Sequence, residues 1–216
     1  MKKIVLFDLD GTLLDTLEDL TDSTNFALES LNYSKKSILE IRSFVGNGVA
    51  KLIKRALPLD VSAEQYEKCL EIFKNHYRKN MYNKTKPYDG IITMLENLKT
   101  KKIKIGIISN KFDLAVKELC AKYFSGLYDI ALGENEAKGI CKKPSPDLVL
   151  KVLENYKIDK HNSIYIGDSE IDIQTANNAG IGCISVLWGF KDEKFLKENN
   201  AKIFVHAPNE ILKYLE

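Results

Sequence analysis

Two aspartates stand two residues apart near the start of the chain, in the stretch FDLDGT (residues 7–12). The apolar run before them predicts a buried strand, and side chains alternate along a strand, so we expect the carboxylates of Asp8 and Asp10 to point the same way. Two carboxylates so close repel each other unless a cation, a shared proton or a substrate uses them. Gly11 allows a sharp turn, which the Thr12 hydroxyl can brace. Alone, the motif fits a solvated acidic turn as well as it fits a site.

Other polar side chains also follow apolar segments that are predicted to be strands. Each alone has an ordinary explanation as a helix cap, a solvated lysine or an acid in the first turn of a helix. Because ligands bind beyond the carboxyl ends of parallel strands, we expect these residues to share one edge of a sheet. They are Ser109 and Asn110 after the segment 103–108, and Asp168 and Asp172 in GDSEID (167–172) after the segment 163–167, with Lys143 in KKPSP (142–146) between these two groups in the sequence.

This combination of acids, one lysine and donors suits phosphoryl transfer. Carboxylates such as Asp8, Asp10 and Asp168 are hard oxygen ligands that favour Mg²⁺. The cation offsets the repulsion between an attacking carboxylate and a phosphate dianion. Asp8 is the predicted nucleophile, which forms an aspartyl-phosphate. Asp10 is the predicted general acid for the leaving alcohol and then the base for water.

The remaining groups are predicted to hold the transferred phosphoryl group. Ser109, the backbone of Asn110 and Lys143 would bind its oxygens as charge spreads over them. Asp172 follows Asp168 by one helical turn, and it would hold a metal-bound water or brace the other ligands.

The periodicity of the chain changes twice. Apolar residues recur at helical spacing through residues 16–83, which contain no strand candidate, and from residue 84 onward helices and strands alternate. This predicts an α/β fold with a doubly wound, mostly parallel sheet, in which a discontinuous core (1–15 and 84–216) carries a helical cap (16–83). Because the insert begins just after the two aspartates, we expect it to act as a lid on the ligand edge of the sheet. The alternative is a passive bundle that fills space.

The boundaries of the expected elements follow from the same patterns. We expect helices in the insert over 17–31, 37–44, 49–57 and 63–80, the last begun by a capping box at Ser62. In the core we expect strands over 4–7, 103–108, 128–132, 163–167, 181–187 and 203–205, and helices over 91–100, 113–122, 146–156 (with Ser145 as its cap), 170–179 (ended by Gly180), 191–199 and 209–215.

Composition and charge exclude several classes of function. The formal net charge of +2 gives no electrostatic reason to expect a nucleic acid or a membrane surface as partner. No apolar run is long enough to cross a membrane. The four cysteines form no CxxC pair, which argues against a zinc or redox motif and favours a reducing, cytoplasmic location.

The ordered set of motifs DLDGT (8–12), ISN (108–110), KKPSP (142–146) and GDSEIDIQTANNAG (167–180) resembles the haloacid dehalogenase superfamily. The resemblance implies a Rossmann-like core, Mg²⁺, an aspartyl-phosphate intermediate and a helical cap inserted after the first motif. Dehalogenases of the superfamily lack the second aspartate, so the presence of Asp10 argues against that branch. Mutases resembling β-phosphoglucomutase usually carry a branched apolar residue where this chain has Thr12, which favours a phosphatase. The cation-transporting ATPases have membrane helices, and none is predicted here.

Among the phosphatases, the chain is similar to phosphoglycolate phosphatases over nearly its full length. The similarity implies a small phosphorylated metabolite as substrate, and 2-phosphoglycolate is the one it favours. The alternatives are a pyrophosphatase, a nucleotidase, a sugar phosphatase or a phosphosugar mutase. A phosphate-binding protein without catalysis is disfavoured because Asp8 and Asp10 are both intact. The stretches that carry the similarity are FVGNGV (44–49), SNK (109–111), KPSPD (143–147), GDSEID (167–172) and WGF (188–190).

A substrate as small as phosphoglycolate needs a second anchor for its carboxylate. The turn Gly46-Asn47-Gly48 could present backbone N–H groups at a helix N-terminus, or it could simply join two helices. Positive charge could come from Arg42, Lys51 or Lys111. The protein is expected to be a monomer or a homodimer.

Overall fold

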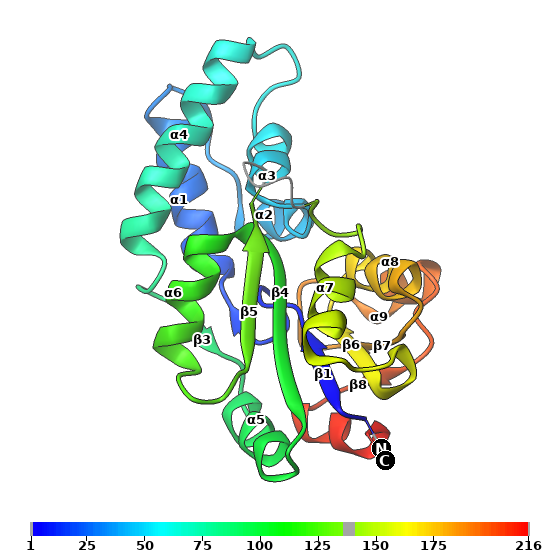
Figure 1. Ribbon diagram of the computed structural model, residues 1–216. Helices are drawn as coiled ribbons and strands as arrows, with labels where there is room; N and C mark the ends of the chain where they lie inside the picture. Colours follow the sequence, from blue (N-terminus) through cyan, green and yellow to red (C-terminus); the bar gives the residue numbers. More distant parts are fainter. Residues whose placement is uncertain (1, 136–140, 216) are drawn as a thin grey trace. The chain divides into compact units, whose positions relative to one another are not determined.

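The computed structural model describes residues 2–135 and 141–215 (Figure 1). The chain forms two compact units. Unit 1 comprises Met1–Leu14 and Pro87–Glu216, and unit 2 comprises Asp15–Lys86. Two short strands, β2 (Leu14–Asp15) and β3 (Lys86–Pro87), pair where the chain passes from one unit to the other.

Unit 1 is built on a six-stranded sheet in the order β5-β4-β1-β6-β7-β8, in which every neighbouring pair is parallel. The central strand β1 is fully buried, which explains its unbroken apolar sequence, since helices cover both faces of a parallel sheet. The predicted α/β class with a mostly parallel sheet is therefore confirmed. The strands are β1 (Ile4–Phe7), β4 (Lys104–Phe112), β5 (Ile130–Glu134), β6 (Ser163–Gly167), β7 (Gly182–Val186) and β8 (Phe204–Val205).

The helices of unit 1 alternate with these strands along the chain. On one face of the sheet α7 and α8 form the core with β1, β4 and β6, where Leu6 and Tyr165 pack with Val152 and Ala176 (Figure 1). The two ends of the described chain meet, because the Lys2 N–H donates to the Leu215 carbonyl at 2.7 Å. The helices are α5 (Ile91–Thr100), α6 (Asp113–Tyr123), α7 (Asp147–Tyr156), α8 (Glu170–Ala179), α9 (Glu193–Glu198) and the 3₁₀ helices η2 (Lys160–Asn162) and η3 (Pro208–Tyr214).

Several details of unit 1 differ from the sequence prediction, including strand β5, which lies two residues later than the expected 128–132. Strand β4 continues to Phe112, past Ser109 and Asn110, and its register against β5 shifts after Ile108. Helix α7 begins one residue later than expected, with Pro146 rather than Ser145 as its cap residue. The last helix is a 3₁₀ helix over Pro208–Tyr214, a form that periodicity alone does not separate from an α-helix.

Unit 2 contains the four predicted helices, α1 (Leu17–Glu29), α2 (Ile38–Phe44), α3 (Val49–Ala56) and α4 (Ala63–Asn80). Local capping fixes where two of them begin. The Ser62 hydroxyl accepts from the Gln65 N–H at 3.2 Å at the start of α4. At the start of α2, Ser37 and Glu40 form a complete capping box that was not predicted.

A buried carboxylate joins the two ends of unit 2. Asp19 in α1 accepts hydrogen bonds from the backbone N–H groups of Lys84 (3.1 Å) and Thr85 (2.9 Å), and from the Thr85 hydroxyl at 2.8 Å. Its side chain is almost completely buried, so these bonds replace the water that the carboxylate loses on folding. Asp19 therefore holds the exit segment of the unit against its first helix.

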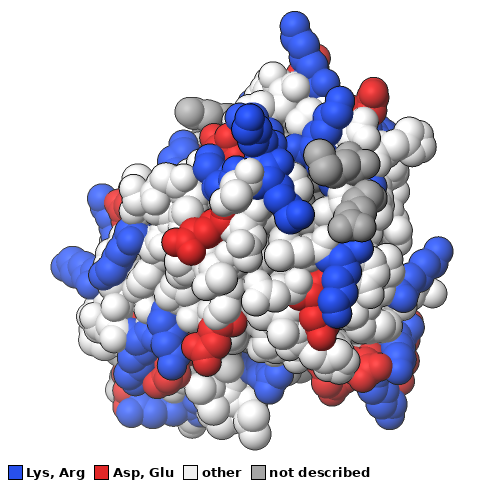
Figure 2. All heavy atoms as spheres, turned by 90° about the horizontal axis from the view of Figure 1, so that it is seen from below, with Lys and Arg blue, Asp and Glu red and all other residues white. Residues whose placement is uncertain are grey.

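The surface carries charges of both signs. On the face drawn in Figure 2, basic and acidic side chains are interspersed around large uncharged areas. Among the residues that the structure describes, no helix is both long and apolar enough to cross a membrane.

We predict that Asp19→Ala lowers the free energy of unfolding by about 2–3 kcal/mol, because it leaves buried donors without an acceptor. The matched control is Asp22→Ala, which removes an exposed ion pair with Lys84 at 2.8 Å. That pair should contribute no more than about 1 kcal/mol. Urea unfolding followed by circular dichroism measures both changes. Equal losses in the two variants would contradict the structural role of Asp19.

Candidate active site

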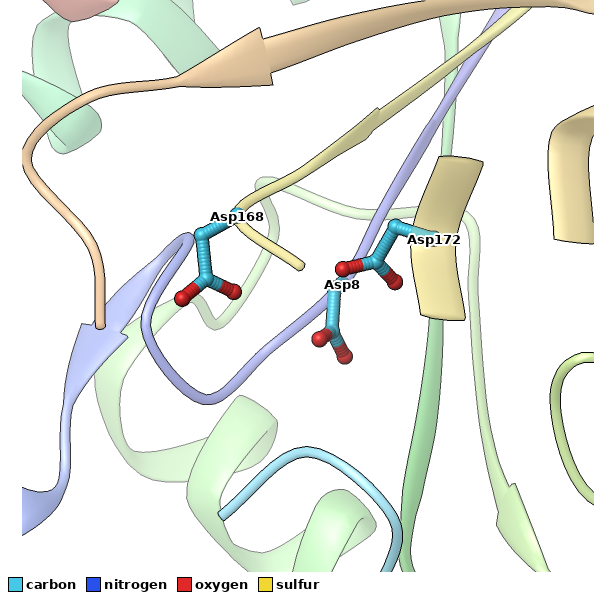
Figure 3. Close-up of side chains that lie close together, drawn as sticks. All are labelled: Asp8, Asp168 and Asp172. Atoms are coloured by element: carbon cyan, nitrogen blue, oxygen red, sulfur yellow. The ribbon is translucent and has the colours of Figure 1, made fainter. Parts of the chain in front are cut away.

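Three carboxylates meet at the carboxyl ends of the central strands (Figure 3). Asp8 directly follows β1, Asp168 follows β6, and Asp172 belongs to the first turn of α8. One oxygen of each lies within 4.8 Å of the others, and all three side chains are buried. In Figure 3 Asp8 lies between Asp168 on its loop and Asp172 on its helix.

Lys143 is the cation that faces this group of acids. Its Nζ lies 2.9 Å from Asp8 Oδ1 and 2.7 Å from Asp172 Oδ1, and its side chain is only 2% exposed. Three carboxylates against one ammonium leave an excess of two negative charges. Such an excess is costly in a buried site unless another positive charge binds there.

Burial is the main cause of the pKa shifts in this site, and the charges of neighbouring groups modify them. Burial raises the pKa of Asp8 to about 7, with Lys143 opposing the rise and Asp172 adding to it. Burial, then the charges of Asp172 and Asp8, raise the pKa of Asp168 well above its ordinary value. Burial lowers the pKa of Lys143, but Asp172 and Asp8 outweigh it and raise that pKa well above the usual range. Lys143 is therefore charged, while burial favours the protonated forms of Asp8 and Asp168, an effect that a bound cation would oppose.

The donor set fits a divalent metal ion such as Mg²⁺. Carboxylate oxygens are the ligands that this hard cation prefers, and its two charges match the excess. Next to the cluster in sequence, Glu170 Oε2 is a buried oxygen without a hydrogen-bond partner among the described residues. Asp172 is already braced, since its Oδ2 accepts from the Ser169 N–H (3.1 Å) and hydroxyl (2.6 Å). The roles of Asp8 and Asp168 as direct ligands and of Asp172 as a brace stay predictions.

Two glycines leave the space that the Asp168 side chain occupies. Its Oδ2 accepts from the Phe190 N–H at 2.7 Å, and its Oδ1 lies 3.4 Å from the Thr12 hydroxyl. A Cβ at Gly189 would lie 2.3 Å from the Asp168 Cβ, and one at Gly11 would lie 2.4 Å from its Oδ2. Gly11 also has φ +85°, which side-chain-bearing residues avoid. The carboxylate thus occupies space that only glycine leaves open.

Asn110 positions Lys143 through its side chain, a role that the sequence did not reveal. Its Oδ1 accepts from the Lys143 N–H at 2.7 Å, and its Nδ2 donates to the Lys143 carbonyl at 3.0 Å. Tyr165 adds a second support, because the Lys143 ammonium lies 5.6 Å from the centre of its ring. The Tyr165 hydroxyl donates to the Ile108 carbonyl at 3.0 Å.

Asp10 lies in a different environment from Asp8. Strand β1 ends at Phe7 and the chain turns at once, with the Leu14 N–H donating to the Leu9 carbonyl, so the predicted alternation along a strand does not apply. The Lys111 ammonium donates to both oxygens of the Asp10 carboxylate, each at 2.9 Å. The structure groups Asp172 with Asp8 and Asp168, whereas Asp10, which was also predicted to serve the metal, pairs with Lys111.

The other predicted residues lie in two places. The Ser109 hydroxyl oxygen accepts from the Lys111 N–H at 3.2 Å, which ties down the end of β4. Gly46, Asn47 and Gly48 lie in unit 2 between α2 and α3, where Gly46 and Gly48 have positive φ and Gly48 caps α3. Their part in substrate binding stays a prediction. Trp188 contacts the first motif, since its Nε1 donates to the Thr12 carbonyl at 3.0 Å.

We predict that Gly189→Ala weakens Mg²⁺ binding at least about tenfold, because the new methyl group displaces Asp168. The control is Gly182→Ala in β7, where a Cβ would lie 3.8 Å from the nearest atom of Ile164. The dependence of the melting temperature on Mg²⁺ concentration gives the affinity of each variant. Unchanged affinity in Gly189→Ala would show that the position of the Asp168 carboxylate does not matter for metal binding.

The sequence of this chain is similar to those of known enzymes. The model of the family described as "Haloacid dehalogenase-like hydrolase" matches residues 5–186. The chain is 34% identical over 189 residues to a phosphoglycolate phosphatase of Aquifex aeolicus, which covers 87% of this chain and 86% of that protein. It is 30% identical over 220 residues to a phosphoglycolate phosphatase of Nitrosospira multiformis, covering 99% and 96%.

The fold agrees with solved structures as well. A crystal structure of a protein from Lactobacillus delbrueckii subsp. bulgaricus superposes with a TM-score of 0.93 at 34% identity, covering 100% of this chain and 99% of that one. Its coverage includes both units. The match over most of the chain, together with these relatives, shows that this protein is an enzyme that belongs to the haloacid dehalogenase-like hydrolases.

Proposed function

We propose that the protein is a Mg²⁺-dependent phosphatase that hydrolyses a small phosphomonoester, 2-phosphoglycolate, through an aspartyl-phosphate on Asp8. The observation that carries the proposal is the buried Asp8 carboxylate, 2.9 Å from Lys143 and grouped with two further acids. A carboxylate held in this way has a fixed direction of attack and a cation for the incoming phosphate. The substrate is taken from the relatives that are named phosphoglycolate phosphatase.

Asp8 and Asp168 would hold Mg²⁺, with Asp172 as a brace. When bound, the ion supplies the positive charge that lets a carboxylate approach a phosphate dianion. Lys143 would bind a phosphoryl oxygen and keep Asp8 oriented, since its ammonium already lies between Asp8 and Asp172. The Ser109 hydroxyl and the Asn110 backbone would hold the other phosphoryl oxygens as negative charge develops on them.

The reaction would proceed in two displacements. An oxygen of Asp8 attacks phosphorus, the bond between phosphorus and the ester oxygen breaks, and the leaving oxygen takes a proton from Asp10. Asp10 then takes a proton from water, whose oxygen attacks the same phosphorus. The bond between phosphorus and the Asp8 oxygen breaks, which releases inorganic phosphate and restores the carboxylate. Gly46, Asn47 and Gly48 of unit 2 are proposed to contribute backbone donors to the substrate.

A panel of substrates tests the proposal directly. Phosphate release is measured with and without Mg²⁺ from 2-phosphoglycolate, pyrophosphate, a nucleoside monophosphate and glucose 6-phosphate. We expect release that requires Mg²⁺ and a value of kcat/KM that is highest for 2-phosphoglycolate. A different preferred substrate would overturn the assignment of 2-phosphoglycolate and leave the proposed chemistry in place. The absence of release from every substrate of the panel would overturn the proposed function itself.

We predict that Asp8→Asn lowers kcat at least about 10³-fold, because an amide cannot form the acyl phosphate. The matched control is Asp147→Asn, since Asp147 is an exposed aspartate four residues after Lys143. It should retain the activity of the wild type. Circular dichroism confirms that both variants fold. Activity in Asp8→Asn equal to that of the control would contradict the assignment of the nucleophile.

We predict that Asn110→Ala lowers kcat about 10–100-fold with a smaller change in KM. The reason is that the backbone N–H and carbonyl of Lys143 lose their hydrogen bonds to the Asn110 side chain. The matched control is Asn178→Ala, which removes an exposed bond of 2.8 Å to the carbonyl of Pro144 in the same loop. Steady-state kinetics of both variants separate the two parameters. If the two alanine variants behaved alike, the positioning role of Asn110 would be wrong.

A further inference from the structure

Lys111 is a buried lysine that the proposed reaction does not use. Its Nζ lies 2.9 Å from both oxygens of Asp10, and the two side chains are 2% and 14% exposed. Among the described residues, Lys111 and Lys143 are the two lysines that are buried. Burying an ammonium is costly, so each of these lysines should have a specific anion to bind.

The two buried lysines face different carboxylates. Lys143 contacts Asp8, the proposed nucleophile, and so it lies on the side of the transferred phosphoryl group. Lys111 contacts Asp10, the proposed general acid, which must touch the leaving oxygen of the ester. An ammonium 2.9 Å from that acid lies next to the leaving group, within reach of substituents on the carbon that carries the leaving oxygen.

The backbone of Lys111 is held in place, so the position from which its side chain extends is fixed. Residue 111 lies near the end of β4, and its N–H donates to the Ser109 hydroxyl oxygen at 3.2 Å. An ammonium carries three N–H donors on a flexible stem, so it can contact Asp10 and a substrate anion together. A neutral alcohol as leaving group would offer nothing for this charge to bind.

We propose that Lys111 determines specificity by binding a carboxylate of the leaving group, on the carbon next to the ester oxygen. This inference rests on the proposed function and deepens it, because it assigns the enzyme to esters of 2-hydroxy carboxylates. A carboxylate carries one negative charge, which one ammonium balances, whereas a second phosphate group brings nearly two. The carboxylate is therefore the better match for a single buried lysine.

Two esters of the same size test this assignment. 2-Phosphoglycolate carries a carboxylate, and 2-hydroxyethyl phosphate carries an uncharged CH₂OH group in its place. For the wild type we expect kcat/KM to be at least about 30-fold higher for 2-phosphoglycolate, the value of a charged hydrogen bond in a buried site. If the wild type hydrolysed the two esters equally well, the assignment would be overturned while the proposed function stood. If it hydrolysed neither, the proposed function would fail first.

The variant Lys111→Met keeps the length of the side chain and removes its charge. We expect kcat/KM for 2-phosphoglycolate to fall about 30–100-fold further than kcat/KM for 2-hydroxyethyl phosphate, because the charged bond to the carboxylate is lost. Any effect through the released Asp10 lowers both values equally and cancels from the ratio. An unchanged ratio would therefore mean that Lys111 only positions Asp10, and it would overturn the assignment.

Three controls complete the experiment. Lys117→Met removes an exposed lysine of α6, 58% accessible, and should leave both rates unchanged. Lys111→Arg keeps the charge and should keep the preference, and the wild-type comparison decides the question if Lys111→Met does not fold. Pyrophosphate, a phosphoanhydride whose leaving group is also an anion, serves as the third control. If Lys111→Met reduced its hydrolysis by the same factor as that of 2-phosphoglycolate, the site would bind any anion and the carboxylate assignment would be wrong.

Discussion

Three buried carboxylates that share a single lysine are the constraint on which the rest of this structure depends. Asp8, Asp168 and Asp172 repel one another, and Lys143 balances only one of the three charges. The surrounding structure serves to hold this unfavourable arrangement in place. Glycines leave room for the Asp168 side chain, the side chain of Asn110 fixes Lys143, and hydrogen bonds from Ser169 brace Asp172. An arrangement that costs stability without a cation is suited to bind one and to direct it at a phosphate.

The parallel sheet is what makes this convergence possible. β1 lies in the middle of the sheet between β4 and β6, so the residues after these three strands meet although they are far apart in sequence. The arrangement separates the acids by partner. Asp8 contacts Lys143 and Asp10 contacts Lys111, each at 2.9 Å. In the proposed reaction, Lys143 would face the phosphoryl group and Lys111 the leaving group, which is the basis of the proposed specificity.

Much of this could be predicted from the sequence, because the signals are local. Apolar runs and helical periodicity predicted the order and type of the longer elements in both units. The polar residues after the strands pointed to Asp8 and Asp168, and the motif KKPSP pointed to Lys143. Contacts between distant residues had no such signal. The pair of Lys111 and Asp10 spans 101 residues and depends on how the end of β4 lies beside the turn after β1. The same holds for the side chain of Asn110, for which only a backbone role was predicted. Asp19 gave no signal because a buried acid in a helix resembles any first-turn acid.

The most direct test of the central claim is calorimetric titration of the metal-free protein with Mg²⁺ in buffers of different ionisation enthalpy. With the pKa of Asp8 raised to about 7, a fraction of the chains carries a proton there at neutral pH, and only the carboxylate form binds the cation. We predict one Mg²⁺ per chain, with proton release at pH 7 that falls as the pH rises and an affinity that rises with pH over the same range. An absence of binding, or binding that is unaffected by Asp168→Asn, would contradict the account.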